Sequence, residues 1–160
     1  MMFYKKINGL RALSIIGVVV YHFFPKVLPH GFLGVDVFFV ISGYLMTKII
    51  VSSLENKRFS LIDFYCARAK RIIPSLMVLI VCLLMFGWFY LIPSSYDSLG
   101  KHGFSSLTFI SNKTYMNDIS YFDQASLNKW LLQTWSLSVE WQFYLIYPLF
   151  LALYKQPNFL

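Results

Sequence analysis

The feature that most constrains this chain is a long run without a charged residue, Ile72–Ile92. A helix rises about 1.5 Å per residue, so a run of this length crosses the hydrocarbon core of a bilayer, which is about 30 Å thick. Three further apolar runs occupy Leu10–Leu28, Gly31–Val51 and Trp130–Tyr154. Charged residues make up only 13% of the chain, against about 25% in soluble domains. The sequence therefore predicts an all-α, polytopic membrane helical bundle with about four to five membrane segments.

Basic residues cluster beside the apolar runs and predict the orientation of the chain. One cluster lies at the entry to the first run, and the other separates the second run from the third. The clusters consist of Lys5, Lys6 and Arg11, and of Lys57, Arg58, Arg68, Lys70 and Arg71. By the positive-inside rule, both clusters and the amino terminus are cytoplasmic. The net charge of +7 is thus explained by topology and does not indicate a nucleic-acid partner.

The region before the last apolar run has a weaker pattern. Ser94–Asn112 contains two basic side chains and only a narrow apolar stripe. The stripe consists of Leu99, Phe104, Leu107 and Ile110 or Ser111. We expect a helix that lies in the membrane interface or dips into it. The following stretch, Lys113–Lys129, is expected to be an external loop.

Arg11 and His22 are polar residues inside the first apolar run. They are eleven positions apart, which on a helix places them within about 20° of one another and about 16 Å apart along the axis. Ionisable groups inside a membrane are costly and usually functional. Histidine exchanges a proton near neutral pH, so His22 is a candidate general base. The structural alternative is a histidine that caps the helix end or bonds to a neighbouring helix.

Two acidic residues are candidates for the same chemistry. Asp36 lies about as far beyond the turn near Leu28 as His22 lies before it, so the two side chains are expected to meet and Asp36 to orient the imidazole. Its alternative role is to cap the second segment. Glu140 lies in the last apolar run, and it is either catalytic or the structural partner of a buried cation.

Arg68 and Arg71 are spaced three positions apart, where the basic linker enters the third run. This spacing places both on one helix face, and the guanidinium fork matches phosphate oxygens. With Arg11 they would form a cytoplasmic phosphate clamp. Their alternative role is to fix topology alone. Cys66, in the same linker, and Cys82 indicate neither a disulfide nor a metal site.

Four motifs together carry a resemblance. The chain contains INGLRALSIIGVVVYHF, GFLGVDVFFVISGYLMT, FYCARAKRIIPSL and TWSLSVEWQFYLIYP, in this order. This series resembles the acyltransferase-3 family of bacterial integral membrane proteins, which includes O-antigen and other surface-glycan O-acetylases. A departure is Trp141, which replaces the second acid of a motif that often reads Glu-Glu-Gln.

The resemblance implies transfer of an acyl group, usually acetyl, from cytoplasmic acyl-CoA to a glycan hydroxyl across the bacterial inner membrane. Lipopolysaccharide and other surface polysaccharides are the expected acceptors, with no metal involved. The family motifs imply that His22 is catalytic and that Arg11, Arg68 and Arg71 bind coenzyme A. Asp36 and Glu140 lie within characteristic motifs and are added as candidate catalytic residues.

The resemblance also concerns length. Family members carry about twice as many membrane helices, so residues 1–160 are expected to be the amino-terminal portion of a single membrane domain. A missing carboxy-terminal half or a partner chain would then complete the site. The alternatives are an inactive fragment and a non-enzymatic membrane subunit or transporter fragment, in which the charged residues form a conduction path or a structural network.

Overall fold

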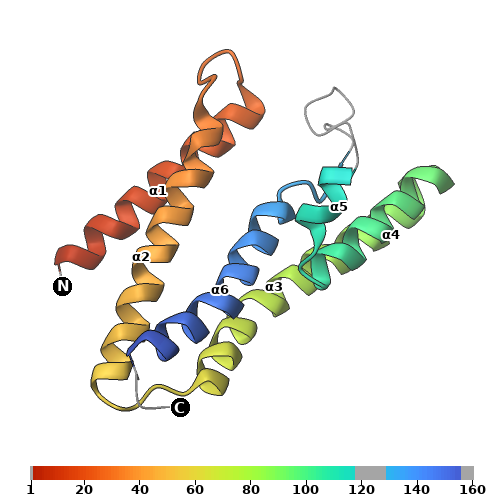
Figure 1. Ribbon diagram of the computed structural model, residues 1–160. Coiled ribbons are helices and arrows are strands. Elements are labelled where there is room, and N and C mark those ends of the chain that lie inside the picture. The colour runs from red at the N-terminus through yellow and green to blue at the C-terminus, as the bar shows by residue number, and fades with distance from the viewer. Residues whose placement is uncertain (1, 118–128, 156–160) are drawn as a thin grey trace. The chain divides into compact units, whose positions relative to one another are not determined.

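The computed structural model describes residues 2–117 and 129–155, and all of the regular structure in these ranges is helical. The chain divides into two compact units, Met1–Arg58 and Phe59–Leu160. The first contains α1 (Met2–Phe23), the short 3-10 helix η1 (Gly31–Leu33) and α2 (Gly34–Glu55). The second contains α3 (Leu61–Tyr90), α4 (Pro93–Leu107), α5 (Ser111–Asn117) and α6 (Thr134–Lys155) (Figure 1).

The first unit is a helical hairpin in which α1 and α2 lie side by side (Figure 1). Helix α1 ends at Phe23, before the predicted end at Leu28, because Pro25 disfavours helical geometry at the residue that precedes it. Glycines let the two helices touch through their backbones. A Cβ on Gly31 would collide with the carbonyl oxygen of Gly17, and one on Gly34 with that of Ser14.

The second unit begins with the long helix α3. The Ser60 side chain caps its amino end by accepting a hydrogen bond from the Asp63 amide at 3.3 Å. The helix therefore starts about three turns before the predicted start at Ile72. Arg68, Arg71 and Cys66 lie within α3, so their predicted location in a linker is wrong. Residues 61–71, which include four charged side chains, are helical because the cap and the following apolar run extend one continuous helix.

Two of the described helical segments are long and apolar enough to cross a membrane, Gly31–Glu55 and Leu61–Tyr90. Ile7–Phe23 is a shorter apolar helix. The all-helical prediction is confirmed for the described residues. The count of four to five membrane segments and the cytoplasmic amino terminus stay predictions.

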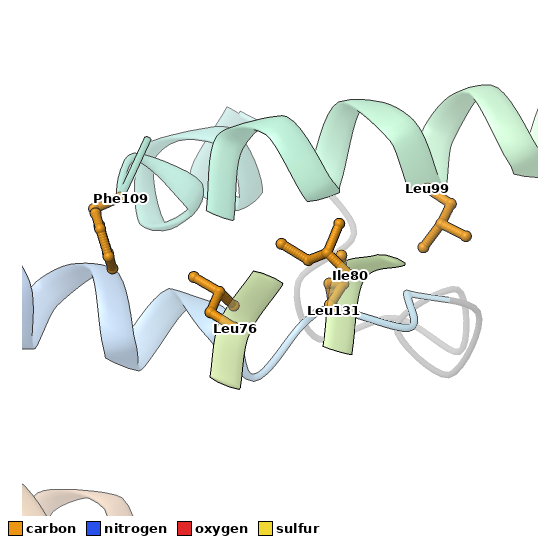
Figure 2. Close-up of a cluster of buried hydrophobic side chains, with 5 residues drawn as sticks. All are labelled: Leu76, Ile80, Leu99, Phe109 and Leu131. Atoms are coloured by element: carbon orange, nitrogen blue, oxygen red, sulfur yellow. The ribbon is translucent and has the colours of Figure 1, made fainter. Parts of the chain in front are cut away.

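The apolar core of the second unit joins α3, α4 and the segment that leads into α6. Its buried members are Leu76, Ile80, Leu99, Phe109 and Leu131 (Figure 2). The α3–α4 contact is close because two glycines lie in it. A Cβ on Gly87 would lie 3.0 Å from Leu99, and one on Gly103 would lie 3.2 Å from Ile80.

Phe109 ends α4 in a left-handed conformation, with φ of 54°. The amide of Ile110 reaches back to the carbonyl of Ser105 at 2.9 Å, and the Phe109 amide bonds to that of Ser106 at 3.1 Å. These two bonds form a Schellman motif, in which glycine is usual at the left-handed position. The Phe109 ring compensates by stacking on Trp141, 4.5 Å between centroids.

The apolar stripe noted for α4 lies largely on the exposed side of the helix. Leu99 is buried, but the Phe104 side chain is 68% exposed. The buried face of α4 instead contains small and polar residues, namely His102, Gly103, Ser105 and Ser106. Small residues and hydroxyls at helix contacts, with apolar side chains outward, are typical of helices packed in a membrane.

The predicted external loop contains a helix at its start. Helix α5 covers Ser111–Asn117, and the rest of the predicted loop up to residue 128 lies outside the described residues. The last predicted segment begins with turns at Trp130–Gln133, and α6 starts at Thr134.

Candidate functional site

Arg11 lies at the contact between the two helices of the first unit. Its guanidinium carbon is 4.8 Å from the centroid of the Phe38 ring on α2, and the side chain is half-buried. A cation over an aromatic face is stabilised by about 0.5–2 kcal/mol, more as water is excluded. The aromatic ring binds only one face of the guanidinium and supplies no hydrogen-bond acceptor. The fork therefore keeps its capacity for anionic oxygens.

His22 is in the last turn of α1, and its side chain is exposed. Its Nδ1 lies 2.8 Å from the carbonyl oxygen of Val18. A carbonyl can only accept, so Nδ1 carries the proton in this hydrogen bond and Nε2 carries the lone pair of the neutral ring. The helix-end position matches the structural alternative from the sequence. The tautomer is nevertheless the one in which Nε2 is the basic atom.

Asp36 is exposed in the first turn of α2. The residue at the N-cap position is Leu33, and it has no side-chain hydrogen bond to the helix end. Asp36 is therefore not the N-cap residue of α2, and the capping role considered for it is wrong. A carboxylate in the first turn still interacts favourably with the positive end of the helix dipole. The expected contact between Asp36 and His22 stays a prediction.

Arg68 and Arg71 both lie on α3, three positions apart, and so share a face of a helix rather than of a linker. Arg71 is exposed, whereas Arg68 is half-buried. The guanidinium carbon of Arg68 lies 5.7 Å from the centroid of the Phe64 ring. Its Nε is buried with no hydrogen-bond partner among the described residues. A partly buried cation with an unsatisfied donor is costly, and an anionic ligand would offset that cost.

Glu140 lies half-buried on α6. Its Oε1 accepts a hydrogen bond from the hydroxyl of Tyr144, one turn later on the same helix and itself buried. A hydroxyl donor stabilises the charged carboxylate and fixes its orientation. Glu140 therefore has a partner within its own helix, an arrangement that the sequence analysis did not anticipate.

Helix α6 contacts its neighbours through other side chains of the motif that contains Glu140, TWSLSVEWQFYLIYP. The sequence analysis did not single out these side chains. Ser138 and Ser111 bring their hydroxyls to 2.7 Å, and Thr134 and Ser106 do the same. The Gln142 amide nitrogen donates to the carbonyl of Phe109 at 2.9 Å.

Gln142 also forms a reciprocal pair of 3.1 Å hydrogen bonds with the amide of Asn112. The signal was present in the sequence, because Thr134, Ser138 and Gln142 recur every fourth residue and so follow one helix face. Glu140 lies about 160° around the helix from Ser138. The motif therefore combines a structural face with a separate acidic one.

Comparison with known proteins identifies the family of this chain. Residues 4–159 match a family model described as an acyltransferase domain. The chain belongs to the acyltransferase-3 family. It is 39% identical over 160 residues to the peptidoglycan O-acetyltransferase OatA of Listeria monocytogenes, covering 96% of this chain and 26% of that protein. It is 37% identical over 145 residues to the O-acetyltransferase OatA of Staphylococcus aureus, covering 89% of this chain and 24% of that protein. No solved structure matches.

These findings bear on two expectations. The resemblance drawn from the four motifs is confirmed, and the family transfers acyl groups other than aminoacyl groups. Lipopolysaccharide as the modified polymer is not supported, because the Listeria relative is named for peptidoglycan. The chain spans about a quarter of the length of both relatives.

Proposed function

We propose that this chain supplies the acyl-donor site of a multi-pass membrane O-acyltransferase in the bacterial cell membrane. The donor is an acyl-coenzyme A, with acetyl-CoA the expected form, and the acceptor is a hydroxyl of a cell-wall glycan. The observation that carries the proposal is Arg68, a half-buried cation whose Nε has no hydrogen-bond partner among the described residues. Such a group is well suited to bind an anion.

The phosphates of coenzyme A are the anions that fit this part of α3. Arg68 and Arg71 provide two guanidinium forks on one helix face, and each can bind two phosphate oxygens at once. Arg11 is proposed as a further donor-binding cation, because Phe38 holds its guanidinium without using its hydrogen-bond donors. Positive charge near the cytoplasmic ends of membrane helices also favours delivery of the donor from the cytoplasm.

His22 is proposed as the general base. Its Nε2 takes the proton from the acceptor hydroxyl as that oxygen attacks the thioester carbonyl. The tetrahedral intermediate then collapses, the carbon–sulfur bond breaks, and the imidazolium returns its proton to the departing thiolate. Each acyl transfer thus converts one thioester to one ester and leaves the histidine neutral. Asp36 and Glu140 are proposed to orient or stabilise the histidine during this cycle.

The proposed acceptor is peptidoglycan, a choice that rests on the printed name of the Listeria relative. Because the chain spans about a quarter of each relative, residues outside it are proposed to complete the acceptor side. Family membership and the two apolar helices of membrane-spanning length support a membrane setting.

The first test measures transfer of radiolabelled acetyl groups from acetyl-CoA in membrane vesicles that contain the protein. His22→Ala should lower the rate about 100-fold or more, the usual contribution of a positioned acid or base. His30→Ala is the matched control, because His30 is also exposed and lies in the turn that follows α1. Transfer that survives in His22→Ala would contradict the role of this residue.

The second test separates a phosphate clamp from a topology signal. Binding of acetyl-CoA to the detergent-purified chain should weaken about 10- to 100-fold in Arg68→Ala, the range for charge-assisted hydrogen bonds. Arg58→Ala removes the same charge from an exposed residue outside α3 and should leave binding unchanged. Equal affinities in both variants and the parent would favour the non-enzymatic subunit or the inactive fragment.

A further inference from the structure

Tyr65 joins α3 to α6 in the second unit. Its hydroxyl donates a hydrogen bond to the carbonyl oxygen of Leu145 at 2.9 Å. The two residues are 80 positions apart in the chain, so this bond fixes one helix against the other. Family comparison, the sequence motifs and the proposed mechanism give Tyr65 no role.

The acceptor of this bond lies one turn before a proline in α6. Pro148 is inside the helix and fully buried. Proline has no N–H and its ring crowds the preceding turn, so the helix is weakened and open to bending here. A side-chain donor from another helix at this turn stabilises one geometry of the turn. Tyr65 therefore bonds to α6 next to the Tyr144 carbonyl, the one that loses its helical N–H donor to Pro148.

Tyr65 also belongs to the turn of α3 that carries the proposed clamp. Arg68 follows it by three positions and shares its face of the helix. The Phe64 ring, which is buried, supports the Arg68 guanidinium. On α6, Glu140 and Tyr144 lie within five residues of Leu145. The bond from Tyr65 thus links the turn that bears Arg68 to the turn that bears the Glu140–Tyr144 pair.

We propose that Tyr65 is a positioning residue for the acyl donor, which holds Arg68 at a fixed place against α6 so that the guanidinium meets the phosphates of coenzyme A. This inference rests on the proposed function of Arg68. Tyr65 itself touches neither the donor nor the acceptor. Its hydroxyl affects donor affinity through the helix position, and the chemical step at saturating donor does not depend on it.

The experiment is a double-mutant cycle on acetyl-CoA binding to the detergent-purified chain, measured by titration calorimetry. Tyr65→Phe keeps the ring and removes only the hydroxyl, and it should weaken binding about three- to tenfold, as expected for loss of one hydrogen bond. In an Arg68→Ala background the same change should have no further effect, because Tyr65 acts through Arg68. Tyr90→Phe is the matched control, since Tyr90 is on the same helix and its side chain is 73% exposed.

A second readout separates positioning from general stability. In the vesicle transfer assay, Tyr65→Phe should raise the KM for acetyl-CoA by the same factor and leave kcat within about twofold. A fall in kcat at constant KM, or an additive effect in the double variant, would overturn the positioning role. Full binding by Arg68→Ala would instead refute the proposed clamp itself, so the two failures are distinct.

Discussion

The close packing of α1 against α2 predicts that Gly34→Ala destabilises the hairpin of the first unit. The backbone there has φ of −57° and ψ of −28°, which alanine adopts freely, so Gly34→Ala acts only through its new methyl group. That methyl would lie 2.9 Å from Val18 Cγ2 and still closer to the carbonyl oxygen of Ser14. Carbon atoms normally pack at about 3.5–4.0 Å, so α1 and α2 must separate by about 1 Å. Overpacking of this kind costs about 1–3 kcal/mol.

Gly43→Ala is the control in the same helix, because a Cβ at Gly43 meets nothing within 4 Å. It should stabilise α2 by about 0.8–1.0 kcal/mol, the difference between glycine and alanine in a helix interior. The two variants should therefore differ by about 2–4 kcal/mol. Thermal unfolding of the purified chain in detergent, followed by circular dichroism, should separate their midpoints by roughly 4–16 °C. Equal midpoints, or a higher one for Gly34→Ala, would refute the backbone-to-backbone packing of this hairpin.

Three further predictions concern stability and use the same unfolding measurement. Gln142→Leu leaves the Phe109 carbonyl and the Asn112 amide without their Gln142 bonds and should cost about 1–3 kcal/mol; an unchanged midpoint would exclude a stabilising role for this amide pair. Phe109→Gly relieves the left-handed strain, about 1–2 kcal/mol, but removes the buried stacked ring, worth about 3–5 kcal/mol, so a net loss is expected and a gain would contradict it. Lys57 has φ of 52° and is exposed, so Lys57→Gly should stabilise the chain by up to about 1 kcal/mol, whereas no change or a loss would show that this turn carries no strain.

The long apolar runs correctly predicted helices, but they did not predict where each helix begins. The uncharged run beginning at Ile72 is helical as expected, but the helix extends back to Leu61 because Ser60 caps it. Four charged residues hid that start, since residues 61–71 look like a linker when only the length of the uncharged run is counted. The buried face of α4 was missed for a different reason. Counting apolar residues alone overlooks small and polar residues such as Gly103, Ser105 and Ser106, which form the contacts of a helix whose apolar side chains face outward.

The sequence predicted one part of the candidate site and missed another. Helical spacing correctly placed Arg68 and Arg71 on one face, because three positions along a helix always share a face. The same spacing could not reveal that Nε of Arg68 is buried or that Tyr144 bonds to Glu140, since these depend on tertiary packing and rotamer choice. Contact between His22 and Asp36 depends on the geometry of the turn between helices, which sequence spacing alone does not define.

The hydroxyl contacts between α4, α5 and α6 have a consequence for biosynthesis. Ser106 pairs with Thr134, and Ser111 pairs with Ser138, so the partners are 28 and 27 residues apart in the chain. At about 5–20 residues per second, a ribosome needs about 1–6 s to make the second partner after the first. During that interval the Ser106 hydroxyl has its hydrogen bond to the His102 carbonyl in the same helix, but not its partner on α6. The side-chain contacts between α4 and α6 therefore form only after α6 has been synthesised, so the order of synthesis sets the order of assembly.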